Sequence, residues 1–136
     1  EKCSRASLAD EIRQTAPSNV TFICKSPSFE ELAHYIRKSA FVLAPYCPES
    51  VLSSGILMDS LSFGSKIIGP EVGSFKDYAR EKRLKVYTFH EYEDIKKTVA
   101  CYKTTPISLE DYRNFLEEND WEHFGNRIIE LVKSLK

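Results

Sequence analysis

The sequence lacks the signatures of several common classes of enzyme and membrane protein. It contains no G-x-G-x-x-G or Walker phosphate-binding motif and no G-x-S-x-G nucleophile elbow. The sequence therefore gives no support for a function as a dehydrogenase, a kinase or a hydrolase. The apolar runs fall far short of the roughly 20 residues that a membrane-spanning helix needs, and no signal-peptide pattern opens the chain.

Patterns of metal ligands and of disulfide pairs are missing as well. The four cysteines are scattered along the chain without C-x-x-C spacing: Cys3, Cys24, Cys47 and Cys101. The three histidines are far apart and show no spacing typical of a metal site: His34, His90 and His123. We therefore expect neither a metal nor a cofactor. We also expect reduced, buried thiols, which favour the cytoplasm.

The chain has no excess of charge of either sign. Its 19 basic and 20 acidic residues leave a net charge of −1, and no basic stripe is present, so nucleic-acid binding is not expected. The 136 residues are 42% hydrophobic and can bury one core of ordinary size, which predicts a single domain, 1–136. Because the chain begins at Glu1 without a methionine, we expect a fragment of a longer protein.

Short apolar runs alternate with helical patterns along most of the chain. The runs that predict strands are Val20–Cys24, Phe41–Ala44, Lys66–Ile68 and Lys85–Phe89. Helical periodicity and capping residues predict helices over 4–15, 29–39, 54–63, 75–82, 92–102, 108–118 and 121–135. Ser28 and Glu31 form a capping box before the second of these helices, and Ser108 caps the sixth.

This alternation predicts the fold class. Strands separated by helices at about 20-residue spacing indicate βαβ units, and hence an α/β, Rossmann-like parallel sheet with flanking helices. Ligands in such sheets lie at the carboxyl ends of the strands. Here those ends are Lys25-Ser26, Pro45-Tyr46, Gly69-Pro70 and Phe89-His90.

One strand–loop–helix unit, Phe41 to Gly69, is the best candidate for a ligand site. The turn Ser53-Ser54-Gly55 opens a helix directly after a strand, and small residues there let a ligand approach the unpaired backbone N–H groups. This pattern predicts an anion site. An equally open interpretation is that serine is an N-cap and glycine a turn residue.

Two acids accompany this turn. Asp59 lies one helical turn after Gly55 on the same side, where its carboxylate could accept hydrogen bonds from vicinal ribose hydroxyls. Glu49, in the loop before the helix, could meet a sugar hydroxyl. The alternative for both is a solvated acid near a helix N-terminus, which the helix dipole favours.

The order of these pieces resembles a known family. The matching segments are Val20–Ile23, Glu30–Ile36, Phe41–Tyr46, Ser54–Gly64, Lys66–Gly69 with Gly73 and Phe75, and Asp120–Leu131. Together they are similar to the C-terminal, donor-binding half of retaining group 1 glycosyltransferases with the GT-B fold. The family's first strand–helix unit has no counterpart in this chain.

The resemblance implies a site for a nucleotide-diphosphate sugar. Backbone amides at Ser53, Ser54 and Gly55 would face the diphosphate, and Asp59 would take the ribose. The loop after Val20–Cys24, with Lys25, would lie beside the base.

Two further positions complete this implied site. Tyr46 stands at the end of the strand that leads into it. The family's first glutamate, which contacts the transferred sugar, falls on Val51. Glu49 is the nearest acid and therefore the catalytic candidate.

The implied function is that of a glycosyltransferase donor-binding domain, acting in polysaccharide or glycoconjugate assembly. Its partners would be the nucleotide-diphosphate sugar and a missing N-terminal acceptor domain of the same chain. We expect the fragment to be inactive alone, and peripheral membrane association of the full-length protein stays open. The helix from Trp121 would have a partly exposed apolar face, open to self-association.

Two alternatives remain beside this prediction. A non-catalytic GT-B-like module that binds a nucleotide or a partner protein would explain Val51 and the shortened acid at Asp59. Half of a GT-B epimerase would share the sheet, but the sequence lacks the acid and histidine pattern expected of it.

Overall fold

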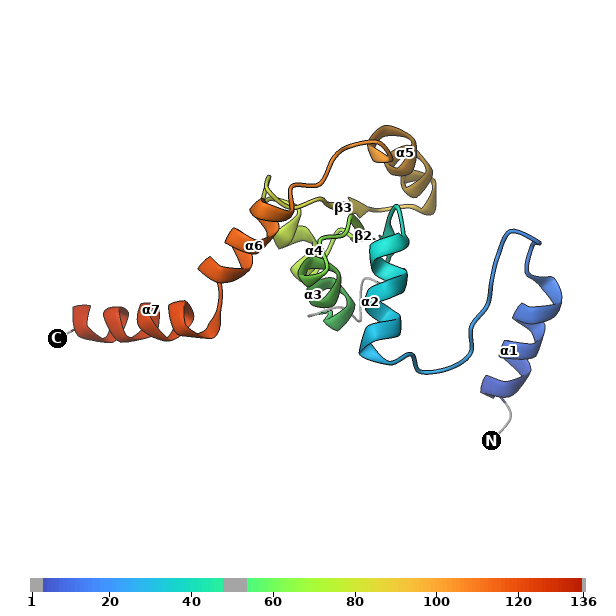
Figure 1. Cartoon of the computed structure of the whole chain (residues 1–136), viewed down its shortest axis with the longest axis horizontal. Coiled ribbons are helices and arrows are strands. Elements are labelled where there is room, and N and C mark those ends of the chain that lie inside the picture. The colour runs from blue at the N-terminus through green and yellow to red at the C-terminus, as the bar shows by residue number, and fades with distance from the viewer. Residues whose placement is uncertain (1–3, 48–53, 136) are drawn as a thin grey trace. The chain divides into compact units, whose positions relative to one another are not determined.

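The computed structural model describes residues 4–47 and 54–135 (Figure 1). The chain divides into two units, Glu1–Glu31 and Leu32–Lys136, and each is described by itself.

The first unit contains helix α1 (Ser4–Thr15), an irregular segment and the first turn of helix α2 (Phe29–Lys38). Helix α1 has the predicted bounds. The strand predicted over Val20–Cys24 is wrong, because this segment has no regular secondary structure. Its apolar side chains Val20, Phe22 and Ile23 are 37–50% exposed. A β-rich run becomes a strand only where a neighbouring strand bonds its backbone, and the described part of this unit offers none.

The predicted capping box at the start of α2 is confirmed. The Ser28 hydroxyl accepts a hydrogen bond from the Glu31 backbone N–H at 3.2 Å, and the Glu31 carboxylate accepts one from the Ser28 N–H at 3.0 Å. Lys25 donates to the same carboxylate at 2.6 Å. The hydrogen bond from Lys25 has the largest effect on Glu31. Together with the bond from Ser28, it holds the pKa of Glu31 below its usual value.

The second unit is built on a parallel three-stranded sheet in the order β1 (Val42–Leu43), β2 (Ile67–Pro70) and β3 (Val86–Phe89). Ile67 pairs with Val42 on one side and Val86 on the other. Three of the four predicted strands are therefore confirmed, as are their parallel direction and the mixed α/β class with flanking helices. All four residues of β2 are buried, as expected of a strand that is covered on both faces.

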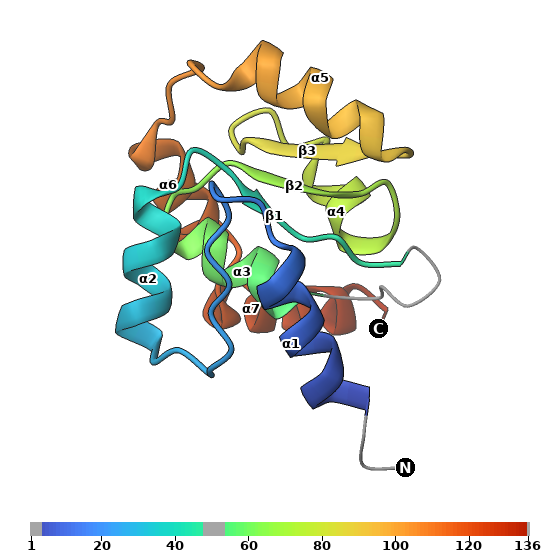
Figure 2. The same cartoon turned by 90° about the vertical axis from the view of Figure 1, so that its right-hand side faces the viewer.

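The described part of this unit contains five further helices: α3 (Gly55–Ser62), α4 (Gly73–Tyr78), α5 (Tyr92–Tyr102), α6 (Leu109–Glu118) and α7 (Trp121–Ser134). Figures 1 and 2 show α5 on one side of the sheet and α3 and α4 on the other. Serine and aspartate side chains cap three of them, through Ser54, Ser108 and Asp120. No helix in the described part of the chain is long and apolar enough to cross a membrane.

The core joins the sheet to α3, α4 and α6. Its buried members are Ala44, Leu57, Leu61, Ile67, Phe75, Leu84, Val86 and Tyr112. The inward face of α3 is formed by Leu57, Ser60 and Leu61, which have no exposed surface.

Tyr112 ties α6 to the amino edge of the sheet. Its hydroxyl accepts a hydrogen bond from the Lys85 N–H at 2.8 Å and donates to the Ser65 carbonyl at 3.0 Å. Burial raises the pKa of Tyr112 to about 12. One side chain thus links the segments that lead into β2 and β3.

The predicted burial of the thiols is wrong for the three described cysteines, Cys24, Cys47 and Cys101, which are exposed. Cys24 lies in the irregular segment of the first unit. Cys101 lies in α5, and no residue of this helix is fully buried. The core cluster of the second unit includes no residue of α5, and Cys101 stays exposed on this helix.

Candidate functional site

A cavity of about 290 Å³ lies where α3 and α4 begin. Because β1 leads into α3 and β2 leads into α4, both helix starts follow carboxyl ends of the parallel strands. The described residues that line it are Ser54, Gly55, Leu57, Met58, Ser74 and Tyr78. The sequence predicted a site at this edge, and the structure places a cavity there.

Ser54 works as the N-cap of α3. Its extended backbone (φ −138°, ψ 117°) lets its hydroxyl accept a hydrogen bond from the Leu57 N–H at 3.3 Å. The N-cap interpretation of this serine is therefore confirmed. The amides of Gly55 and Ile56 precede Leu57 in the first turn, where a helix provides no acceptor of its own.

Gly55 leaves the start of α3 open. Among the described residues, a Cβ atom placed on it would have no neighbour within 4 Å, apart from the helix's own backbone and the adjacent residues. The fold therefore does not require glycine here through close packing. The missing side chain instead leaves room for a ligand to reach the first-turn amides from the cavity.

Ser74, in the first turn of α4, contributes a second polar group. Its hydroxyl is buried and has no hydrogen-bond partner among the described residues. A buried hydroxyl left unpaired costs about 1–3 kcal/mol, and a polar ligand atom in the cavity would remove this cost. Sequence analysis missed Ser74. The signal was the pair Gly73-Ser74 directly after a strand, which repeats the small residues of Ser54-Gly55.

Ser60 carries the other buried hydroxyl without a partner among the described residues. It lies on the core face of α3 and does not line the cavity. Only the Ser74 hydroxyl thus combines burial, lack of a described partner and a place in the cavity wall.

Of the remaining predicted site residues, Tyr46 is brought to the site. Its hydroxyl lies 3.5 Å from the Ser54 hydroxyl, and its ring lies 6.2 Å from that of Phe75, measured between centroids. Asp59 is half-buried and is absent from the described lining, where α3 contributes Met58 instead. Its role toward a ribose stays a prediction.

Three further predicted positions lie outside the described part of the second unit. Lys25 belongs to the first unit, where it pairs with Glu31. Glu49 and Ser53 lie outside the described residues, as does Val51. The assignment of Glu49 as the catalytic acid therefore stays a prediction.

A histidine–carboxylate pair lies at the same edge of the sheet. His90 follows β3, Glu71 follows β2, and the His90 Nε2 atom is 2.6 Å from a Glu71 carboxylate oxygen. His90 is exposed, with 75% of its side chain accessible. Among the described residues, no group of three or more histidine, cysteine, aspartate or glutamate side chains could hold a metal ion.

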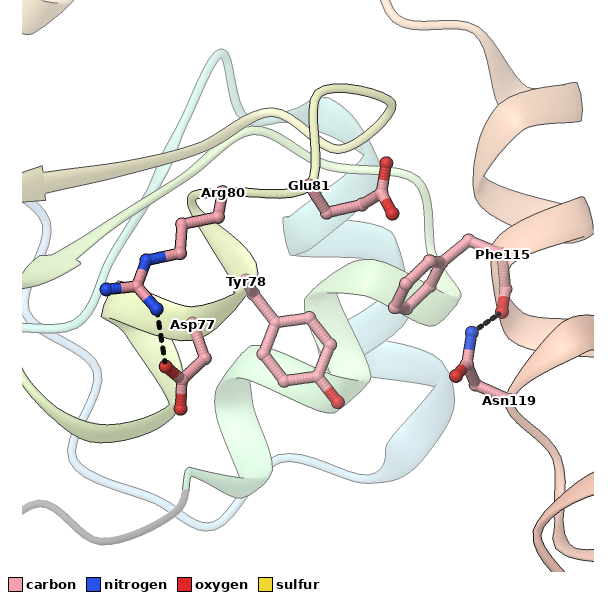
Figure 3. Close-up of a pocket in the computed structure, with 6 residues that line it drawn as sticks. All are labelled: Asp77, Tyr78, Arg80, Glu81, Phe115 and Asn119. Carbon is pink, nitrogen blue, oxygen red and sulfur yellow. Dashed lines mark hydrogen bonds and ion pairs between the residues drawn. The ribbon is translucent and has the colours of Figure 1, made fainter. Parts of the chain in front are cut away.

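A second cavity, of about 420 Å³, lies between α4 and α6 (Figure 3). Its described lining is Asp77, Tyr78, Arg80, Glu81, Phe115 and Asn119. Figure 3 shows the Tyr78 and Phe115 rings close together, with centroids 5.8 Å apart.

The charged groups of this second cavity are paired within the protein. Arg80 pairs with Asp77 at 3.8 Å, and Glu81 holds the Arg83 guanidinium at 3.1 Å. We therefore regard this cavity as a gap between two packed helices. It offers a charged ligand fewer free polar groups than the cavity at α3 does.

Comparison with known proteins gives no match: no family model, no curated protein and no solved structure corresponds to the chain.

Proposed function

We propose that this chain is the donor-binding domain of a glycosyltransferase and holds a nucleotide-diphosphate sugar in the cavity at α3. The domain would act with an acceptor domain to transfer the sugar to a glycan or glycoconjugate, in polysaccharide biosynthesis. One observation carries the proposal: the first turn of α3 and the Ser74 hydroxyl, which has no partner among the described residues, meet in one cavity at the carboxyl ends of β1 and β2. The sequence resemblance to GT-B donor domains supports the choice of ligand.

The cavity offers chemistry suited to a diphosphate. Its polar groups include the first-turn amides of α3 and the Ser74 hydroxyl, which are hydrogen-bond donors. The N-terminal end of a helix carries roughly half a positive charge, so an anion is stabilised there. At about 290 Å³ the cavity has room for the diphosphate, with base and sugar extending beyond it.

In the proposed reaction the domain acts by position and electrostatics. It holds the donor so that the anomeric carbon faces the acceptor. The amides and the Ser74 hydroxyl stabilise the charge that develops on the diphosphate as it leaves. None of the described lining residues is basic, so in this proposal full neutralisation of the diphosphate falls to groups outside the described lining.

The second candidate function is a non-catalytic module that binds a nucleotide or a partner protein. Two observations favour it: Val51 stands where the family has its first glutamate, and Asp59 is absent from the described cavity lining. The two functions share nucleotide binding and differ in turnover.

Binding of UDP, GDP and ADP to the chain tests the shared part, by calorimetry and by the ³¹P resonances of the ligand. We expect at least one to bind. The variant Gly55→Val fills the open side of α3 and should weaken binding at least 10-fold, and Ser74→Ala should weaken it about 3-fold or more. Ser62→Ala is the matched control, since this exposed serine bonds the Met58 carbonyl at the far end of α3. If the native chain binds none of the three, the proposed site is wrong.

Turnover by the full-length gene product separates the two candidates. Transfer or hydrolysis of any sugar from a panel of nucleotide-diphosphate sugars supports the glycosyltransferase. Binding without turnover supports the module.

A further inference from the structure

The wall of the cavity at α3 has a polar part and an apolar part. The polar part consists of the backbone amide of Gly55 and the hydroxyl of Ser74, in the first turns of α3 and α4. Met58 and Tyr78 line the same cavity three and four residues further along these two helices. Residues with this spacing lie on one side of a helix. On both helices the wall therefore changes from polar to apolar within one turn of the helix start.

The two apolar side chains of this wall are accessible and held in place. Met58 is 41% exposed, although its neighbour Leu57 is fully buried. Tyr78 is partly buried, and its ring packs against that of Phe115, with centroids 5.8 Å apart and planes at 72° (Figure 3). The ring is thus positioned before a ligand arrives, which lowers the entropy cost of binding to it.

The hollow surface continues on the Tyr78 side of the cavity. Tyr78 also lines the cavity of about 420 Å³ between α4 and α6, and a third cavity of about 500 Å³ where α6 meets α7. A ligand larger than the cavity of about 290 Å³ at α3 therefore has room to extend past this ring.

We propose that Met58 and Tyr78 bind the sugar ring that is joined directly to the bound phosphate. This inference rests on the proposed function. A nucleotide-diphosphate sugar has two rings of this kind, the ribose and the transferred sugar. Both carry C–H groups on the faces of the ring, which pack against a thioether or an aromatic side chain, while their hydroxyls point outward to other partners.

Distance and charge support this assignment. One helical turn advances by about 5.4 Å, which is similar to the separation of a phosphate from the sugar ring next to it. A phosphate at the starts of α3 and α4 therefore brings that ring to the level of Met58 and Tyr78. The face of an aromatic ring is partly negative, so Tyr78 favours a neutral ring over a second phosphate group.

Met58 is itself the most direct probe, because it is the single methionine of the sequence. Labelling with ¹³C-methyl methionine gives one signal, and this signal comes from the wall of the site. We expect a saturable shift of the signal with UDP, GDP or ADP or with their glucose conjugates, and a much smaller shift with pyrophosphate, which has no ring. A bound nucleotide that leaves the Met58 signal unchanged would overturn the proposal.

Two variants test the contact by affinity. Tyr78→Leu removes the aromatic ring, and Met58→Gln keeps the length of the side chain but makes its end polar. Each should weaken binding of a ligand that carries the contacted ring about 3- to 10-fold, and leave the affinity for pyrophosphate within about 2-fold. Tyr78→Phe keeps the ring and should bind like the native chain. Tyr92→Leu, at an exposed position in α5, is the matched control.

The ligands also distinguish the two rings. A loss of affinity for the nucleoside diphosphates assigns the ribose to Met58 and Tyr78, whereas a loss confined to the glucose conjugates assigns the transferred sugar. Unchanged affinity for all of these ligands in either variant would overturn the role of that residue, as would an equal loss for pyrophosphate, which indicates a structural effect. If none of the ligands binds to the native chain, the proposed function itself is wrong.

Discussion

The backbone of Gly69 in β2 lies directly against the ring of Phe75 in α4. A Cβ atom on Gly69 would come within 2.2 Å of that ring, and Phe75 has no exposed surface. The absence of a side chain at one residue therefore sets how closely α4 packs on the sheet. This packing in turn positions the neighbouring Ser74 in the wall of the candidate site.

Gly69→Ala should destabilise the fold. The added methyl group must displace the buried Phe75 ring, and overpacking of this kind costs about 1–3 kcal/mol. Urea unfolding followed by circular dichroism measures the change. Gly55→Ala is the control, since its Cβ meets open space and should change the free energy of unfolding by less than about 0.5 kcal/mol. Equal effects of the two variants would contradict the packing argument.

Tyr112→Phe should lower stability and change its pH dependence. The variant leaves the Lys85 N–H and the Ser65 carbonyl without their partner, at a cost of about 1–3 kcal/mol.

The sign of the pH effect follows from the raised pKa of Tyr112, about 12 in the folded chain against 10.0 for the free side chain. The folded state favours the neutral phenol, so this stabilisation is complete below pH 10 and is lost as the pH rises toward 12. Unfolding measured between pH 9 and 12 should therefore show a steeper loss of stability for the native chain than for Tyr112→Phe. Tyr92→Phe, at an exposed position, should leave the stability at neutral pH unchanged.

Lys66→Met should loosen the end of α5. The buried Lys66 ammonium group donates to the carbonyl oxygens of Tyr102 at 2.8 Å and Lys103 at 2.7 Å, so it satisfies the C-terminus of this helix. Its loss should cost about 1–3 kcal/mol and speed amide exchange in the last turn. Lys96→Met removes an exposed lysine of α5 that pairs with Glu93, and it should cost less than about 0.5 kcal/mol. Unchanged exchange in Lys66→Met would show that α5 does not depend on this cap.

Asp59→Ala tests the predicted ribose contact. A carboxylate that accepts hydrogen bonds from ribose hydroxyls contributes about 1.5–3 kcal/mol, so the affinity for the bound nucleoside diphosphate should fall at least about 10-fold. The affinity for pyrophosphate, which has no ribose, should not change. Asp77→Ala removes an exposed acid paired with Arg80 and serves as the control. If Asp59→Ala binds both ligands like the native chain, the ribose assignment is wrong.

The parts of the fold that local chemistry determines were predictable. Helices α1 and α5 have the predicted bounds, and the capping bonds of Ser28 and Ser108 form as expected. Strands β1, β2 and β3 lie within or beside their predicted runs. In each case the signal lies within a few residues, as an apolar period or a capping side chain.

The errors concern residues whose state depends on distant contacts. Val20–Cys24 has the composition of a strand and lacks a described strand to pair with in its unit. The thiols of Cys24, Cys47 and Cys101 were expected to be buried and are exposed, because burial depends on which segments pack over them.

The sequence by itself determined the helices, most of their caps, three parallel strands and the edge of the sheet at which the cavity at α3 lies. Only the tertiary structure decided that the Ser74 hydroxyl is buried beside the start of α3, that Gly55 lines a cavity, and that no described element of the second unit covers the apolar side chains of α7. The physical reason is the distance along the chain over which each interaction acts. Capping and periodicity act over one or two helical turns, whereas burial and unmet hydrogen bonds depend on which distant segments pack together.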